Sequence, residues 1–324
     1  MSRWGLPILC VLGVMLAVLG LCVGSTGWQA PWSMGADEGL RQMVWEIRAP
    51  RTLGAALVGA LLGLGGALAQ GLFRNPLAEP YLLGSSSGAG LCMALVLTLG
   101  LPWAVSTGWW ARMGLTGCAF MGALAGVSVT LLMARGAAHT MRLLLAGVVV
   151  GVVLGAFTQL MMVWSGEAWR VMQAFMLGNT AMLGWSACGV MGVVAVVCLP
   201  LALMLARVLD ALSLGEDTAR SLGLPLDVSR AALVAVMALA TAAAVAQAGL
   251  IAFVGLVAPH LVRPWSGGQH RRLLLGASLM GAVLLMASDV LARSLLAPQE
   301  LPVGVLTAVM GGVYLLILLH RSPV

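Results

Sequence analysis

The chain has 324 residues, of which 61% are hydrophobic and only 9% are charged, with a net charge of +6 and a mean hydropathy of +1.03. A soluble domain would carry about 25% charged residues, so the composition excludes an ordinary soluble protein and predicts an all-α, polytopic membrane protein. The basic residues are all arginine and are scattered between apolar runs, which excludes a phosphate-binding loop with its lysine and gives no indication of nucleic-acid binding.

About ten apolar runs approach the length of roughly 20 residues that a helix needs to cross a bilayer. They cover residues 4–24, 52–72, 82–100, 114–134, 143–164, 185–206, 231–249, 251–265, 273–291 and 303–319. Nine is the main alternative, because the run at 251–265 is short and follows a tight turn. The first run could also be a signal peptide, but its length and the missing A-x-A-like site favour a span. Residues 1–324 are predicted to form a single transmembrane domain.

Glycines recur four residues apart within several runs. The rows are Gly59 and Gly63, then Gly122 and Gly126, then Gly147, Gly151 and Gly155. Such rows let helix backbones approach closely inside a membrane, and they predict a tightly packed bundle.

The distribution of arginine predicts the orientation of the chain. Ten spans place both termini on one side of the membrane, and the loops on that side hold more arginines than the loops on the other. Because cytoplasmic loops carry the excess of basic residues, both termini are predicted to lie in the cytoplasm.

The second and third runs are joined by an unusually polar segment, RNPLAEPYLLGSSSGAG, at residues 74–90. Pro76 and Pro80 prevent a continuous helix through it. Irregular backbone at membrane depth is tolerated only beside protein or water. The local residues are consistent with a plain turn or with part of a functional opening.

A short helix is predicted in the loop between the sixth and seventh runs, SLGEDTARSLGLPLD at 213–227. Ser213 and Glu216 have the spacing of a capping box. Gly223 stands where a C-terminal glycine belongs, and Pro225 follows it. The segment is either an ordinary connecting helix or a docking surface for a cytoplasmic protein.

None of the eleven acidic residues falls in the middle of a predicted span. Ion-coupled carriers generally keep such a residue there. Asp289 comes nearest, and Arg293 can pair with it four residues later on the same helix face. The pattern favours energy supplied by a partner, while an ion-coupled secondary transporter of a small organic solute stays as the alternative because sodium also binds backbone carbonyls.

Several short motifs follow one another in a specific order along the chain. They are IRAPR (47–51), RNPLAEPYLLGSSSGAG (74–90), RLLLAG (142–147), LGEDTARSLGLP (214–225), GLIAFVGLVAPHLVR (249–263), DVLAR (289–293) and ELPVG (300–304). Over nearly its whole length the chain resembles the FecCD-like permease subunits of ABC importers for vitamin B12, haem and iron–siderophores. The resemblance implies the type II importer fold, with ten helices in each subunit.

The resemblance also implies partners and a location. A second copy of the chain would complete a homodimer, two cytoplasmic ABC ATPase subunits would bind ATP and Mg, and a periplasmic substrate-binding protein would deliver the substrate. The chain itself is expected to bind no cofactor or metal and to catalyse no reaction. It would carry an iron chelate (ferric siderophore or haem) or cobalamin across the bacterial inner membrane.

Two groups of residues on the cytoplasmic side acquire roles from the resemblance. Asn75, Leu77 and Thr140 would form part of the cytoplasmic gate. A coupling helix within about 210–228 would rest on the ATPase through Leu214, Gly215, Glu216, Ala219, Arg220 and Leu222.

A third group, on the outer side, would receive glutamates of the binding protein. It consists of Arg48, Arg51 and Arg293. Exposed ion pairs of this kind contribute only about 0–1 kcal/mol each, so they would mainly orient the encounter. The alternative is that these arginines simply extend towards water at the membrane interface.

The substrate pathway is expected along residues 157–177 and parts of the last run. Met161, Met162, Trp164, Met172 and Met176 offer a soft, adaptable apolar surface, although the same residues would suit a packed core equally well. His260 and Arg263 follow the PHxxR pattern of the family and are expected to be structural.

Overall fold

The computed structural model describes residues 5–24, 27–29, 38–100, 109–137, 139–164 and 166–321; for 109–112, 164, 166–168, 319 and 321 only the backbone is described. The described parts form the helices α1 (Gly5–Cys22), α2 (Glu38–Met43), α3 (Ala49–Phe73), α4 (Ser85–Thr98), α6 (Trp109–Met133), α7 (Thr140–Trp164), α8 (Gly166–Leu177), α9 (Trp185–Ser213), α10 (Glu216–Ser221), α11 (Leu226–Ala248), α12 (Val254–Ser266), α13 (His270–Ser294) and α14 (Val303–Arg321). A π-helical turn η2 (Val44–Arg48) and a 3-10 turn η3 (Pro80–Leu83) precede α3 and α4. The strands β1 (Val23–Gly24) and β2 (Gly27–Trp28) pair antiparallel as a short hairpin after α1.

The fold class is all-α, as the composition predicts, but the count of full spans is not ten. Among the described residues, seven helical stretches are long and apolar enough to cross a membrane. The other three predicted spans correspond to the shorter helices α4, α12 and α14. In α4 and α12 the cause is visible in the backbone, because irregular segments at 74–84 and 249–253 replace the first turns that a full span would have.

The bundle is centred on α3, which is buried along most of its length. Its closest neighbour is α13, because the predicted glycine row lets the two backbones touch. A methyl group added to Gly59 would lie 2.2 Å from the carbonyl oxygen of Gly281, and one on Gly63 would lie 2.1 Å from that of Ala277. The helix-packing role predicted for Gly59 and Gly63 is confirmed.

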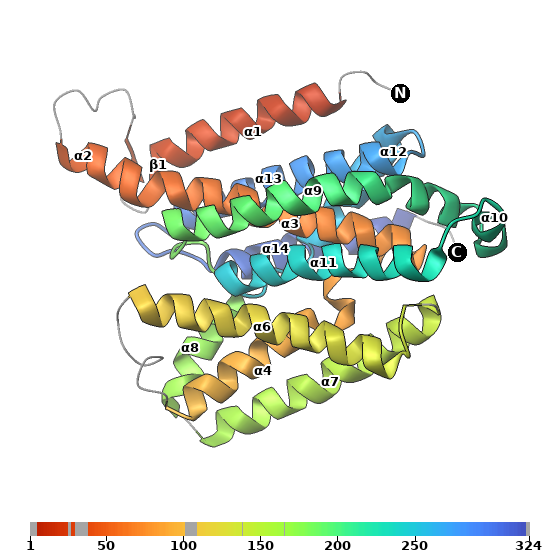
Figure 1. Ribbon diagram of the computed structural model, residues 1–324. Helices are drawn as coiled ribbons and strands as arrows, with labels where there is room; N and C mark the ends of the chain where they lie inside the picture. Colours follow the sequence, from red (N-terminus) through yellow and green to blue (C-terminus); the bar gives the residue numbers. More distant parts are fainter. Residues whose placement is uncertain are drawn as a thin grey trace.

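The helices divide into two groups on either side of α11 (Figure 1). One group contains α3, α9, α12 and α13, while α4, α6, α7 and α8 lie together on the other side. The second glycine row brings α6 against α4 in the second group, since a methyl group on Gly122 would lie 2.5 Å from the carbonyl oxygen of Gly88 and one on Gly126 would lie 2.4 Å from that of Gly84.

The long helices run side by side, so the molecule has two ends (Figure 1). The start of α1, the short helix α10 and the end of α14 lie at one end, called here the α10 end. The hairpin and α2 lie at the opposite end, called the α2 end.

Candidate functional site: the gate loop and helix α10

The predicted gate residues Asn75 and Leu77 lie in a tight turn directly after α3. The helix ends there because Arg74 adopts a left-handed conformation (φ 50°) and Pro76 has no N–H to continue the helical ladder. Within the turn, the N–H of Leu77 donates to Asn75 Oδ1 over 2.9 Å, and the N–H of Ala78 donates to the Asn75 carbonyl over 3.1 Å. Asn75 therefore holds the turn together and leaves Leu77 exposed at its tip.

Two further side chains of this loop form hydrogen bonds to the irregular segment at 249–253, which separates α11 from α12 and is called here the break. Glu79 Oε1 accepts a hydrogen bond from the N–H of Phe253 over 3.0 Å, and the Tyr81 hydroxyl donates to the carbonyl of Ile251 over 3.0 Å. Buried backbone groups outside a helix need such partners. Burial raises the pKa of the Glu79 carboxyl, and the bond from Phe253 partly offsets that rise. This loop, residues 74–84, contains two of the predicted gate residues and is called here the gate loop for that prediction. These bonds fasten it to the irregular segment at 249–253.

Arg263 joins α12 to the end of α3. Its Nη2 donates to Gln70 Oε1 over 2.7 Å, and Gln70 Nε2 donates to the carbonyl of Leu256 over 3.1 Å. The helices approach closely enough because Gly66 has no side chain: a methyl group there would lie 1.7 Å from the Gly255 carbonyl oxygen. The structural role expected for Arg263 agrees with this geometry.

The other flank of the gate loop rests against α6 and α7. The Thr130 hydroxyl donates to the carbonyl of Leu83 over 2.9 Å, and a methyl group on Gly147 would lie 2.0 Å from the Leu82 carbonyl oxygen. Thr140, the third predicted gate residue, is half-buried at the start of α7. No hydrogen bond between Thr140 and the gate loop occurs within the described residues, so the structure brings Asn75 and Leu77 together but does not join Thr140 to them.

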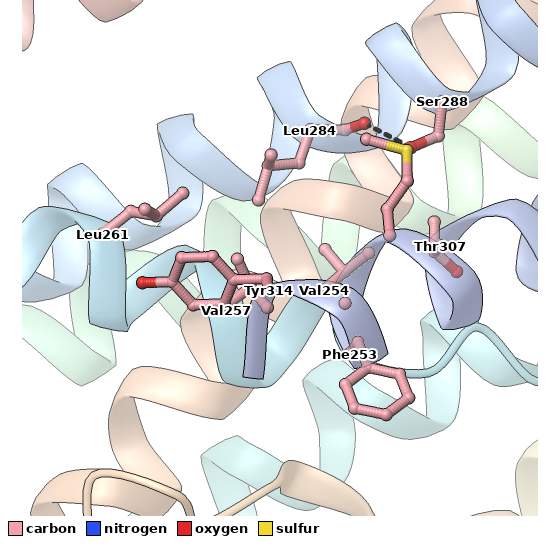
Figure 2. Close-up of a pocket in the computed structure, with 10 residues that line it drawn as sticks. Phe253, Val254, Val257, Leu261, Leu284, Ser288, Thr307 and Tyr314 are labelled. Atoms are coloured by element: carbon pink, nitrogen blue, oxygen red, sulfur yellow. Dashed lines mark hydrogen bonds between the residues drawn. The ribbon is translucent and has the colours of Figure 1, made fainter. Parts of the chain in front are cut away.

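A cavity of about 240 Å³ lies between α12, α13 and α14, beside the break (Figure 2). Most of its lining is apolar, and Phe253 and Tyr314 border it. Two of the three hydroxyl-bearing side chains that line it are already used: Ser288 donates to the Leu284 carbonyl over 2.8 Å and Thr307 to that of Gly304 over 3.0 Å, which leaves the Tyr314 hydroxyl. The cavity therefore lacks the convergent polar groups that usually orient a polar ligand.

The short helix predicted near 213–222 is present as α10, with different bounds. It begins at Glu216 because the preceding Gly215 has φ 111°, a conformation that favours glycine. Ser213 belongs to α9, and its hydroxyl donates to a carbonyl of that helix over 2.6 Å, so the predicted capping box is wrong. Gly223 follows α10 with φ 77°, as predicted for a C-terminal glycine.

The residues predicted to contact an ATPase do not all face outwards. They are Leu214, Gly215, Glu216, Ala219, Arg220 and Leu222. Leu214, Arg220 and Leu222 are exposed, and Gly215 is half-buried. Ala219 is fully buried, so its side chain is not available to a partner. The exposed surface of α10 therefore includes fewer residues than the predicted set of contacts, because one face of the helix packs on α9.

Glu216 is turned towards the bundle and forms ion pairs with two arginines of the same chain. Its Oε1 lies 2.5 Å from Arg230 Nη2 in α11 and 3.5 Å from Arg74 Nη2 in the gate loop. We call Arg74, Glu216 and Arg230 the Glu216 cluster. The Glu216 carboxylate is therefore engaged inside this chain; the coupling role predicted for Glu216 stays a prediction.

A second charged group, the Asp289 cluster, lies at the α2 end and consists of Arg51, Thr180, Asp289, Arg293 and Glu300. Asp289 Oδ1 accepts from Arg51 Nε over 3.0 Å and from the Thr180 hydroxyl over 2.6 Å. Its Oδ2 pairs with Arg293, which confirms the pair predicted from the four-residue spacing. Arg51 Nη1 also contacts Glu300 Oε2 over 2.8 Å. The arrangement satisfies Asp289 completely within one chain.

The three arginines predicted to dock a binding protein are buried rather than exposed. Arg48, Arg51 and Arg293 are 3%, 6% and 1% accessible. Arg48 donates to the carbonyls of Leu21 and Cys22, each over 3.1 Å. The expectation of exposed ion pairs is therefore corrected, because each guanidinium is already bound inside the chain; the docking role itself stays a prediction.

The residues predicted to line the pathway are divided between core and surface. Met162 and Met172 are buried in the cluster formed with α4 and α11, as the alternative of a packed core predicts for these two side chains; the pathway role stays a prediction. Met161 is half-buried against the same cluster, and Met176 is 40% exposed. The side chain of Trp164 lies outside the described residues.

Sequence reasoning left several residues of these sites without a role. Glu79 and Tyr81 lie inside the motif RNPLAEPYLLGSSSGAG at 74–90. The sequence feature that could have identified them is a polar side chain next to a helix-breaking proline in an otherwise apolar chain. Arg230 and Thr180 had no local signal, because their partners are distant in the sequence.

Comparison with known proteins agrees with this architecture. Residues 9–321 match the FecCD transport family. The chain is 41% identical over 331 residues to the vitamin B12 import system permease protein BtuC of Citrobacter koseri, covering 99% of this chain and 94% of that protein. It is 38% identical over 326 residues to the hemin transport system permease protein HmuU of Yersinia pestis, covering 99% and 96%.

Solved structures give the same answer for the fold. An inward-facing structure of a metal-chelate type ABC transporter matches with a TM-score of 0.87 and 29% identity, covering 97% of this chain and 98% of that chain. PsaBC from Streptococcus pneumoniae matches with a TM-score of 0.61 and 16% identity, a likeness that extends to the fold alone.

Proposed function

The chain belongs to the FecCD transport family, and from this premise we propose that it is the permease of a binding-protein-dependent importer driven by ATP hydrolysed in a partner subunit. The observation that carries the proposal is the connection between α10 and the gate loop. The exposed residues Leu214, Arg220 and Leu222 lie on α10 or next to its two ends, and the first residue of this short helix pairs with the loop that follows α3. A partner that moves α10 would thereby act on the gate.

The proposed substrate is a large metal chelate: an iron chelate (ferric siderophore or haem) or cobalamin. Two relatives are named for vitamin B12 and hemin transport, and a structural neighbour is described as a metal-chelate type transporter. One predicted pathway residue, Met176, also fits a ligand of this kind, because its exposed side chain presents a soft apolar surface. A lining of this kind would bind a bulky chelate weakly and release it readily.

The proposed assembly contains two copies of this chain, two cytoplasmic ABC ATPase subunits and a periplasmic binding protein. ATP and Mg would be bound by the ATPase, and this chain would bind no cofactor and act only in transport. The α10 end, with both termini, would face the cytoplasm of a bacterial inner membrane, as the distribution of arginine predicts. Asn75, Leu77 and Thr140 would then lie at the cytoplasmic gate.

The proposed cycle uses two features of the site. The gate loop is fastened to the break before α12 through Glu79 and Tyr81, so the loop and the break would move together. ATPase closure would shift α10 and, through Glu216, the turn at 75–78. Rigid elements with two discrete arrangements can transmit such a movement.

The test is uptake by proteoliposomes that contain this chain, its ATPase and its binding protein. Labelled cobalamin, haem and ferric siderophores are offered one at a time, with and without ATP. Accumulation of one ligand that requires ATP is the expected result. Hydrolysis of ATP without movement of any of them would contradict the proposed substrates.

An ion-coupled secondary transporter is the alternative that the same experiment addresses. The one acidic residue buried deep in a described long helix, Asp289, is neutralised by two arginines, which does not favour ion binding there. Accumulation driven by an ion gradient, with the ATPase omitted, would overturn the proposed class.

A further inference from the structure

The Glu216 cluster joins three segments that are far apart in the sequence. Glu216 is the first residue of α10, Arg230 lies in α11, and Arg74 is the residue that ends α3. Both arginines contact the same carboxylate oxygen, Oε1. The position of that single atom therefore determines the geometry of both ion pairs.

The two ion pairs differ in strength. Arg230 is fully buried, and its pair with Glu216 spans 2.5 Å. Arg74 is 44% exposed and its pair spans 3.5 Å. Because water screens the second pair far more than the first, a small movement of α10 would break the contact to Arg74 before the contact to Arg230.

The weaker contact lies next to the gate. Arg74 immediately precedes Asn75, the residue that holds the turn through its side chain and its carbonyl. Arg74 also has a left-handed backbone (φ 50°), which is sparsely populated for residues with a side chain. A contact that helps to keep Arg74 in place thus bears directly on the conformation of the turn.

We propose that Glu216 is a positioning residue that links α10 to the gate loop: Arg230 fixes its carboxylate, and Arg74 transmits the position of α10 to the turn at 75–78. This inference rests on the proposed function. It assigns to Glu216 a task inside the permease and leaves contact with the ATPase to the exposed residues Arg220 and Leu222.

The first test separates coupling from ATPase binding in the reconstituted complex. Arg74→Gln removes only the weaker pair, so we expect uptake per ATP hydrolysed to fall by about two- to fivefold, with the affinity for the ATPase unchanged. Arg74→Lys, which keeps the charge, should restore most of the loss. Arg74→Glu, which places like charges together, should lower the ratio further.

Two control variants on α10 sharpen this test. Asp217→Asn removes the same charge as Glu216→Gln, but Asp217 is exposed and forms no ion pair with the part of the chain that the structure describes. Arg220→Ala should weaken ATPase binding, because Arg220 is exposed on α10. The proposal is overturned if Arg74→Gln lowers uptake per ATP no more than Asp217→Asn does, or if its loss arises from ATPase affinity instead.

A second test uses the chain alone in nanodiscs and does not depend on transport. The amides of Leu77 and Ala78 bond to Asn75, so their hydrogen exchange reports the state of the turn. Arg74→Gln and Glu216→Gln should each speed this exchange at least twofold, while Asp217→Asn should not. Equal exchange in all variants would overturn the link, whereas failure of wild-type uptake beside a positive exchange result would reject only the proposed function.

Discussion

The charged clusters at the two ends of the molecule are built in opposite ways. In the Asp289 cluster, a fully buried carboxylate is bound by two arginines and a hydroxyl. In the Glu216 cluster, a half-buried carboxylate binds one arginine tightly and another loosely. In the Asp289 cluster, every contact of the central carboxylate is short and buried. In the Glu216 cluster, the contact to Arg74 is long and partly exposed, so a small displacement breaks it.

The difference follows from what the two clusters join. The Asp289 cluster ties α3 and α13, which are already in backbone contact, to the segments before α9 and α14. The Glu216 cluster ties a six-residue surface helix to a loop. We infer that the Asp289 cluster fixes the fold at the α2 end and that the Glu216 cluster permits movement at the α10 end.

The largest expected effect is that of Asp289→Ala. Removing one partner of a buried ion pair leaves uncompensated charge and costs about 3–5 kcal/mol, and here Arg51 and Arg293 both lose their partner. Unfolding of the purified chain by denaturant in detergent measures the loss. Asp217→Asn on the surface should change the same free energy by less than about 0.5 kcal/mol; an equally small change for Asp289→Ala would show that the Asp289 cluster does not fix the fold.

Thr180→Val should have a smaller effect of the same kind. The substitution keeps the shape of the side chain but removes its hydrogen bond to Asp289 Oδ1. A bond to a charged group contributes about 1.5–3 kcal/mol. Unfolding by denaturant again provides the measurement, and a variant as stable as the wild type would mean that the two arginines alone satisfy the carboxylate.

Glu300→Gln should change stability by no more than about 1 kcal/mol, because the Glu300 side chain is 27% exposed at the rim of the Asp289 cluster. It leaves Arg51 bound to Asp289 while removing its second carboxylate. Binding-protein affinity at low and high salt is the informative measurement. Charge reversal of Arg51 itself would disrupt the core, so Glu300→Gln is the milder variant for testing whether this region takes part in docking. An unchanged affinity for the binding protein at both salt concentrations would argue against a docking role of this region.

Arg74→Gln should have the smallest effect on stability, within about 0.5 kcal/mol, because its ion pair is long and partly exposed. The same denaturant series measures it. A loss above about 2 kcal/mol would show that the Glu216 cluster supports the fold as the Asp289 cluster does, and the contrast between the two ends would disappear.

Much of the fold could be predicted from the sequence, because apolar length and glycine spacing act locally. The Gly59 and Gly63 row lies at a close helix–helix contact as expected, although the sequence did not indicate that the neighbour is α13. The breaks before the two short helices were located from Pro76, Pro80 and the tight turn before 251, but the starts of the helices were not. Runs predicted from 82 and 251 begin as α4 at Ser85 and α12 at Val254, because hydropathy alone extends a run into the irregular segment before it.

The candidate site was predictable in part. Asn75, Leu77 and the helix at 216–221 were found through motifs and turn residues. The direction in which each side chain points was not. Arg48 and Arg51 look like surface residues in a sequence, and only the folded chain reveals that carbonyl groups and a carboxylate from distant segments surround them. For Arg293 the pair with Asp289 was predicted from the spacing, but its burial was not.

The most direct test of the contrast between the two ends is hydrogen exchange in the assembled complex, measured without binding protein and compared between nucleotide-free and ATP-bound states. The account predicts that ATP changes exchange in the gate loop and α10, at 74–84 and 214–223, and leaves the Asp289 cluster, at 178–184 and 289–301, unchanged. A change of equal size in both regions, or in the Asp289 cluster alone, would contradict it.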